Sequence, residues 1–148
     1  MRPVAAAGGR RPEVRHFHLT LSLERGAVTA ARHDVTAALA EFGYPSHTAF
    51  SDAVLLVVSE LVTNVVQHAA DRSPTLDVGV TAGPGELVIT VEDRDPRIPD
   101  LAPAAVGGGL RVVTELATEY GGSLVAQPLP LGEGKSMQVR LLPPVGAR

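Results

Sequence analysis

Cysteine is absent from this 148-residue sequence, which excludes disulfide bonds, thiolate metal sites and cysteine nucleophiles. Aromatic residues make up only 3% of the chain and the formal net charge is −3, so the stacking rings and the basic field that nucleic-acid binding needs are both missing. Apolar runs are interrupted by Glu60, Asn64 and His68 before they reach the ~20 residues of a membrane span. We therefore expect a cytoplasmic protein that binds neither nucleic acid nor membrane.

The length suits one compact domain and is too short for a second full domain. Residues 1–14 carry several arginines around a short Ala/Gly stretch and lack the apolar segment of a signal peptide, so we interpret them as a flexible basic tail. We expect residues 15–143 to form the domain and residues 144–148 to be a short C-terminal tail.

Hydrophobic periodicity predicts both the elements and their order. The expected elements are a strand at 17–23, helices at 27–42 and 46–70, strands at 76–81 and 87–91, a helix at 107–120, and strands at 123–127 and 136–142. Ser46 is the expected cap of the second helix, whose apolar residues cover most of its circumference and place it in the interior. The order predicts an α+β two-layer sandwich, with a mixed or antiparallel sheet and its helices on one face.

The segment from Arg94 to Val106 contains Pro96, Pro99 and Pro103, which exclude regular structure over most of it. A loop of about a dozen residues is uncommon in a compact domain. Loops of this length often serve as lids or binding segments, so this loop is a candidate part of a site.

A polar stripe runs along the apolar helix at 46–70. Glu60, Asn64 and His68 are spaced four residues apart, which places them on one helix face. A carboxylate in a dry core would cost several kcal/mol, so the stripe is expected to face a cleft, a ligand or a compensating residue. The alternative is a partly exposed helix end with solvated polar groups, and spacing alone does not decide between the two.

Two further features suggest a ligand site. Asp93 continues the buried face of its strand, where it is either a ligand-binding acid or a turn-forming residue. The Gly107–Gly109 run opens a helix, where exposed backbone amides can bind anions, although a flexible loop end would have the same composition. This is not a P-loop, because the Gly134–Ser136 segment opens a strand rather than a helix.

The order of these motifs resembles the GHKL ATPase superfamily. Residues 60–69, ELVTNVVQHA, resemble its N box, Val91–Asp93 its adenine-binding box, and Gly107–Leu110 its second glycine box. Gly134–Ser136 stands in the place of the family's Gly-Thr. The closest resemblance is to free-standing domains of the anti-sigma-factor serine/threonine kinase type, over about residues 14–143.

The resemblance implies the Bergerat fold, with ATP held between the helices and the proline-rich loop, and with Mg²⁺ bridging its phosphates. It implies that Asn64 coordinates Mg²⁺, that Glu60 polarises an attacking hydroxyl or water, and that Asp93 accepts a hydrogen bond from the adenine amino group. The other nucleotide-binding residues that it implies are His68, Gly107, Gly108, Gly109, Leu110, Lys135 and Ser136. Gly107 to Gly109 would meet the phosphates, and Ser136 would support the adenine site.

The leading hypothesis is an ATP-binding regulator of transcription. It would phosphorylate a serine or threonine of an antagonist protein, sequester a sigma factor, or do both, and a homodimer is compatible with it. The alternative is a non-catalytic interaction module with a degenerate nucleotide pocket, because residues 94–97 contain no glycine where the family has Asp-x-Gly-x-Gly. A third interpretation treats the polar groups as caps and solvated turns.

Overall fold

One five-stranded sheet runs through the residues that the computed structural model describes, 13–148. The elements are β1 (Arg15–Ser22), α2 (Ala27–Glu41), α3 (Ala49–His68), β2 (Thr75–Gly83), β3 (Glu86–Asp93), α4 (Gly108–Glu119), β4 (Ser123–Pro128), the 3₁₀ turn η1 (Pro130–Gly132) and β5 (Lys135–Leu141). Every pairing in the order β1-β2-β3-β5-β4 is antiparallel. Residues 1–12, most of the predicted basic tail, lie outside the described part.

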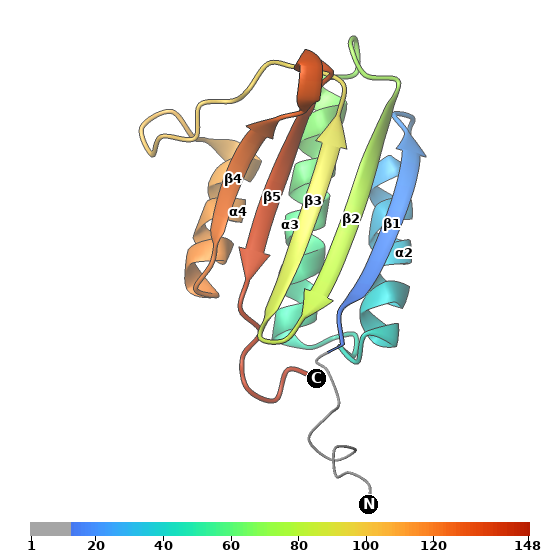
Figure 1. Cartoon of the computed structure of the whole chain (residues 1–148), viewed down its shortest axis with the longest axis vertical. Helices are drawn as coiled ribbons and strands as arrows, with labels where there is room; N and C mark the ends of the chain where they lie inside the picture. Colours follow the sequence, from blue (N-terminus) through green and yellow to red (C-terminus); the bar gives the residue numbers. More distant parts are fainter. Residues whose placement is uncertain (1–12) are drawn as a thin grey trace, which may run out of the picture.

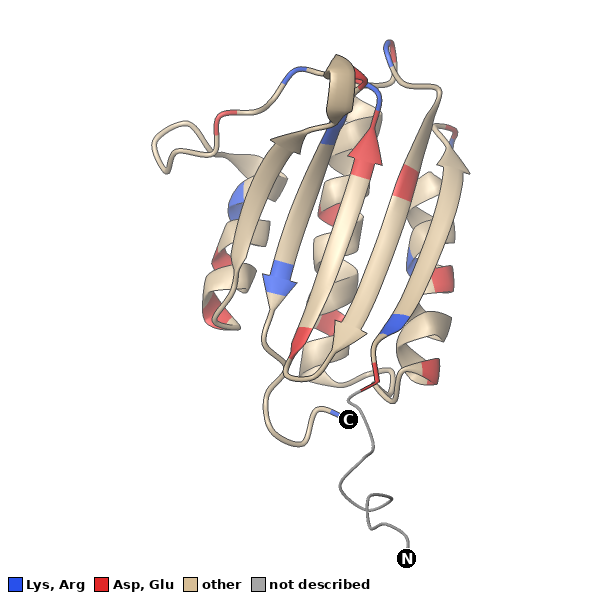
Figure 2. Cartoon of the chain, viewed as in Figure 1, with Lys and Arg blue, Asp and Glu red and all other residues tan. Residues whose placement is uncertain are grey.

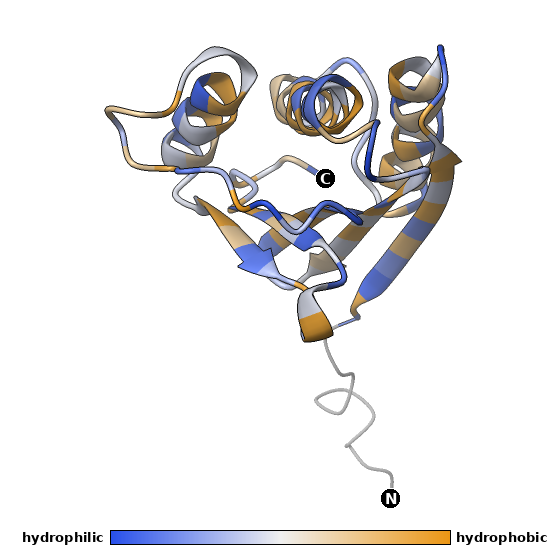
Figure 3. Cartoon of the chain, turned by 90° about the horizontal axis from the view of Figure 1, so that it is seen from above, coloured by the Kyte–Doolittle hydropathy of each residue, from blue (hydrophilic) through white to orange (hydrophobic). Residues whose placement is uncertain are grey.

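The three α-helices of the described chain lie on the same face of the sheet (Figures 1 and 3). Strands β2 and β3 bury every second residue, as expected for a sheet covered on one side. The predicted α+β two-layer sandwich is therefore confirmed, with an antiparallel rather than a mixed sheet.

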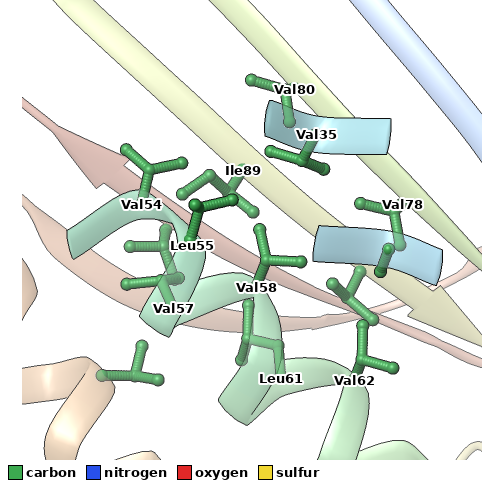
Figure 4. Close-up of a cluster of buried hydrophobic side chains, with 14 of the residues drawn as sticks. Val35, Val54, Leu55, Val57, Val58, Leu61, Val62, Val78, Val80 and Ile89 are labelled. Carbon is green, nitrogen blue, oxygen red and sulfur yellow. The ribbon is translucent and has the colours of Figure 1, made fainter. Parts of the chain in front are cut away.

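Helix α3 is the central helix of the core. Its Val54, Val58 and Val62 are completely buried, and Figure 4 shows all three in one cluster of buried side chains with Ile89 of β3. The helix is long and apolar enough to cross a membrane by length and composition, but 56% of its apolar stretch is buried in the fold. Packing against the sheet and the neighbouring helices accounts for its hydrophobic character.

Helix α3 begins at Ala49, three residues after the predicted cap. Thr48 caps it instead, because its Oγ1 accepts a hydrogen bond from the Ser51 amide at 3.1 Å. His47 adopts a left-handed conformation with φ 67°, which separates Ser46 from the helix. The prediction of Ser46 as the cap was therefore wrong.

Residues 94–107 contain no helix or strand, as the prolines predict. This loop leaves the end of β3 and passes the upper ends of the strands to reach α4 (Figure 1). The loop thus connects the end of β3 to the start of α4.

Near the lower ends of the strands, the C-terminal residues contact the domain: the Arg148 guanidinium lies 4.7 Å from the centre of the Tyr44 ring.

Candidate functional site

A cavity of about 620 Å³ opens between α3, the first turn of α4 and the loop. This volume lies in the range of small-molecule sites, roughly 300–1,000 Å³. The residues that line it are Glu60, Thr63, Asn64, Gln67, His68, Asp95, Arg97, Ile98, Pro99, Asp100, Ala105, Val106, Gly107, Gly108, Gly109, Leu110 and Lys135. Eight of the ten residues expected in the site are among them; Asp93 and Ser136 are not.

The polar stripe of α3 forms one side of this cavity. Glu60, Asn64 and His68 all line it, so the structure brings the three together. Thr63 and Gln67 line it too and were missed in the sequence, although each lies three residues after a predicted site residue on the same helix face.

The first turn of α4 faces the stripe. Gly107 precedes the helix in an extended conformation, Gly108 has φ 54°, and there is open space where either would carry a Cβ. A Cβ on Gly109 would collide with Oε2 of Glu60. The carboxylate of Glu60 therefore lies against the backbone at the positive end of the α4 dipole, and a side chain at position 109 would displace it from there.

Asp93 ends β3 with its side chain fully buried. Its Oδ1 accepts hydrogen bonds from Lys135 Nζ at 3.0 Å and from the Asp95 amide at 2.7 Å. Its Oδ2 has no partner within residues 13–148, which is costly for a buried carboxylate oxygen. Asp93 thus lies behind the cavity lining rather than on it.

Lys135 begins β5 and is only 5% exposed, yet it lines the cavity. Its ammonium donates to Asp93 Oδ1 and, at 3.2 Å, to the Asp95 carbonyl oxygen. A Cβ on Gly134 would collide with the Asp93 carbonyl oxygen, so glycine permits the close approach of β5 to β3 that places Lys135 here.

Asp95 and Arg97 form a second charge pair that was missed in the sequence. Arg97 Nε donates to both carboxylate oxygens of the buried Asp95 at 2.9 Å, and Arg97 Nη2 donates to the His68 carbonyl oxygen at 3.0 Å. The side-chain hydrogen bonds from Arg97 hold the pKa of Asp95 well below its usual range, and they raise the pKa of Arg97. The pair ties the start of the loop to the end of α3.

Ser136 does not reach the cavity. Successive residues of a strand point to opposite faces, and Lys135 and Met137 face the helices, so Ser136 faces the other side of the sheet. Its register partner on β3 is Glu92, not Asp93. Lys135 is the register partner of Asp93, so of these two predicted site residues only Lys135 lies at the cavity.

The cavity therefore has two different ends. We call Glu60, Asn64 and Gly107–Gly109 the glycine end. We call the lining residues Asp95, Arg97 and Lys135, together with Asp93 behind them, the charged end. Figure 2 shows charged residues of both signs gathered where β3 and β5 meet the loop, whereas the middles of these two strands carry none.

The model of the histidine kinase-like ATPase domain family matches residues 21–124, more than half of the chain. The chain belongs to this family. Membership supports ATP binding, and the sheet with its three helices is the GHKL ATPase fold that the sequence predicts.

Solved structures agree on the fold of this histidine kinase-like ATPase domain. The RsbU and RsbW domains of Rv1364c from Mycobacterium tuberculosis match with a TM-score of 0.64 and 18% identity over 86% of this chain and 32% of theirs. The histidine kinase domain of the blue-light activated histidine kinase EL346 from Erythrobacter litoralis matches with a TM-score of 0.52 and 22% identity, over 78% of this chain and 60% of its own. A comparison with curated proteins finds no match.

The residues present fit a nucleotide. The glycine end offers open space beside backbone amides at a helix N-terminus, where phosphates bind readily. The charged end holds a buried carboxylate oxygen without a partner. No three His, Asp or Glu side chains of residues 13–148 are grouped to hold a metal ion, so Asn64 could supply one hard oxygen to Mg²⁺ only alongside phosphate oxygens.

Proposed function

We propose that this domain is an ATP- and Mg²⁺-dependent regulatory kinase of the anti-sigma-factor type. It would phosphorylate a serine or threonine of an antagonist protein, sequester a sigma factor, or do both. The proposal combines the family membership with the sequence resemblance to the anti-sigma-factor kinase type. The match to a structure that contains an RsbW domain is consistent with it at the level of the fold.

The observation that carries the proposal is the contact between Glu60 and Gly109. It brings an acid to the point where the first turn of α4 offers its amides, with Asn64 four residues further along α3. A catalytic carboxylate, an oxygen ligand for magnesium and an anion-binding helix terminus are the groups that phosphoryl transfer needs within a few ångströms of each other.

Each residue then has a distinct role. Asn64 would hold Mg²⁺ through its amide oxygen, and the amides of Gly107–Gly109 would orient the phosphates. ATP, when bound, supplies the phosphoryl group. Glu60 would accept the proton of the attacking hydroxyl as that oxygen bonds to the γ-phosphorus and the bond from the γ-phosphorus to ADP breaks, so that ADP leaves. Asp93 and Lys135 at the charged end would hold the base.

Nucleotide binding is tested by thermal unfolding with Mg-ATP. A ligand at 100 times its dissociation constant stabilises the folded state by about 2.7 kcal/mol. We expect this shift in the wild-type domain and its loss in Asn64→Ala. Gln138→Ala, on the helix-free face of the sheet, is the control and should keep the shift. Equal shifts in both variants would exclude Asn64 from the site.

Phosphoryl transfer is tested with γ-labelled ATP and candidate antagonist proteins, in the wild-type domain and in Glu60→Gln. Glutamine keeps the shape of the side chain but cannot accept the proton, so labelling should fall about 100-fold or more while the ATP-dependent thermal shift remains. Equal labelling by both proteins would remove Glu60 from the mechanism.

The non-catalytic interaction module has one specific observation in its favour. Where the family has two glycines, this chain has Asp95 and Arg97, whose charged side chains bond to each other. Lys135 donates a further hydrogen bond to the backbone carbonyl oxygen of Asp95. This alternative predicts no thermal shift at millimolar Mg-ATP, so the binding experiment separates the two functions.

A further inference from the structure

We infer that Arg97 is a positioning residue for the nucleotide base. It holds the side chain of Asp95, and the backbone of residue 95 in turn holds one carboxylate oxygen of Asp93 and leaves the other oxygen free for the base. This inference rests on the proposed function, in which Asp93 helps to hold the base, and it concerns only the charged end of the cavity.

The backbone of Asp95 is bonded to both members of the buried ion pair. Its amide donates to Asp93 Oδ1 at 2.7 Å, and its carbonyl oxygen accepts a hydrogen bond from Lys135 Nζ at 3.2 Å. Lys135 Nζ also donates to the same Oδ1 at 3.0 Å. The position of the Asp95 backbone therefore sets the orientation of the Asp93 carboxylate and of its counter-ion.

The side chain of Asp95 is held by Arg97. Asp95 is buried, and both of its carboxylate oxygens accept hydrogen bonds from Arg97 Nε at 2.9 Å. The Arg97 amide also donates to Oδ1, at 3.0 Å. Arg97 Nη2 donates to the His68 carbonyl oxygen at 3.0 Å, so the guanidinium joins the loop to the end of α3. A planar guanidinium fixes a carboxylate in direction as well as in distance.

One oxygen of Asp93 remains for a ligand. Oδ1 accepts two hydrogen bonds, whereas Oδ2 is buried and accepts none from residues 13–148. A rotation of the carboxylate would exchange the two oxygens, and the bonds from Asp95 and Lys135 oppose it. Because an ionised carboxylate only accepts hydrogen bonds, Oδ2 can bind the 6-amino group of adenine, which is a donor, but not an acceptor such as O6 of guanine.

The contact between Arg97 and Asp95 stands where the family motif has two glycines. Glycine has no side chain, so a glycine loop cannot be anchored to α3 in this way. The charged side chains at positions 95 and 97 are therefore compatible with a working base site whose acid is held by different means. The interaction-module alternative instead treats them as a sign that nucleotide binding is lost.

The test is binding of ATP and of purine riboside triphosphate, which lacks the 6-amino group. Titration calorimetry with Mg²⁺ compares the wild-type domain and Arg97→Ala, at a temperature where both are folded. The wild type should bind ATP about tenfold or more tightly than the analogue, the strength of one hydrogen bond to a charged group. In Arg97→Ala the dissociation constant for ATP should rise about tenfold, whereas that for the analogue should change by less than about threefold. A merely structural role would weaken both nucleotides by the same factor.

Arg94→Ala is the matched control, because it removes the same charge from the same loop. Arg94 does not line the cavity, and its hydrogen bond to Ser73 Oγ comes from the backbone amide, which alanine keeps. This variant should retain the preference for ATP over the analogue.

A double-variant cycle tests the route of the effect through Asp95. Asp95→Ala should lose the preference for ATP as Arg97→Ala does. Because both changes break the same contact, the double variant Asp95→Ala, Arg97→Ala should lose no more of the preference than either single variant. Additive losses would mean that Arg97 does not act through Asp95, and would overturn the inference.

The outcomes separate this inference from the proposed function. If Arg97→Ala leaves both affinities unchanged or weakens ATP and the analogue equally, the inference is overturned. Loss of the preference in Arg94→Ala as well would assign the effect to net charge and would also overturn it. Tight ATP binding by the wild type with no preference over the analogue overturns the inference but not the proposed function. Failure of the wild type to bind either nucleotide overturns both.

Discussion

The two ends of the cavity are built in opposite ways. The glycine end consists of backbone amides with open space beside Gly107 and Gly108, faced by Glu60 and Asn64. The charged end is a network in which Asp93, Lys135, Asp95 and Arg97 bond to one another. A ligand can bind at the glycine end without breaking a hydrogen bond of the protein. At the charged end, most of the polar atoms that it meets already hydrogen-bond to one another. Substitutions at the charged end are therefore expected to lower mainly the free energy of unfolding. Substitutions at the glycine end are expected to lower mainly the rate of phosphoryl transfer.

The largest effect is expected from Lys135→Met. It leaves the buried Asp93 carboxylate without its charged partner, and breaking a buried ion pair in this way costs about 3–5 kcal/mol. The free energy of unfolding in urea measures it. The double variant Asp93→Asn, Lys135→Met removes both charges and should recover most of the loss. A single variant as stable as the double variant would mean that Asp93 does not depend on Lys135.

The second largest effect is expected on the rate of phosphoryl transfer in Gly109→Ala. This change places a Cβ close to Glu60 Oε2, so the carboxylate must move away from α4. Loss of a positioned general base lowers the rate of phosphoryl transfer about 100-fold or more. Gly83→Ala is the matched control, because open space surrounds that position and it lies outside the cavity. Similar rates for Gly109→Ala and the wild type would show that the position of Glu60 is not critical.

The glycine end could be predicted from the sequence because its geometry is local. Four-residue spacing places Glu60, Asn64 and His68 on one face of any helix, and a glycine run before a helix exposes amides wherever the helix packs. The charged end depends on tertiary structure. The register of β5 against β3 decides whether Lys135 or Ser136 lies opposite Asp93. A slip of the register by one residue would move every side chain of the strand to the other face of the sheet.

The loop residues were missed for a related reason. Asp95 and Arg97 flank Pro96 in a segment without periodicity, so no pattern indicates that their side chains turn back toward the end of α3. The only sequence features that could have predicted this pair are the spacing of two residues between Asp95 and Arg97 and their opposite charges. The start of α3 was misplaced because Ser46 and Thr48 are both suitable caps, and only the backbone conformation of His47 decides between them.

A smaller loss of stability is expected from Asp95→Asn, and it should depend on pH. The Arg97 hydrogen bonds lower the folded-state pKa of Asp95 below the ~3.9 of an unfolded aspartate. A carboxylate with a lowered pKa stabilises the fold above its unfolded pKa, and this contribution is lost as the pH falls. The variant should be less stable by about 1–2 kcal/mol at pH 7, and the difference should shrink below about pH 4. A difference independent of pH would show that the ionised form of Asp95 is not what stabilises the loop.

The smallest effect is expected at Thr48, at the end of α3 opposite the cavity. Thr48→Ala removes the hydrogen bond to the Ser51 amide and should cost about 1 kcal/mol in unfolding free energy. The Mg-ATP thermal shift should stay unchanged, because no atom of this cap lines the cavity. Thr48→Ala therefore shows how a loss of stability by itself affects nucleotide binding. The variants at the two ends of the cavity are compared with it. If Thr48→Ala weakened nucleotide binding as much as Asn64→Ala does, loss of binding in the Asn64 variant would report on the stability of α3 rather than on a contact with the ligand.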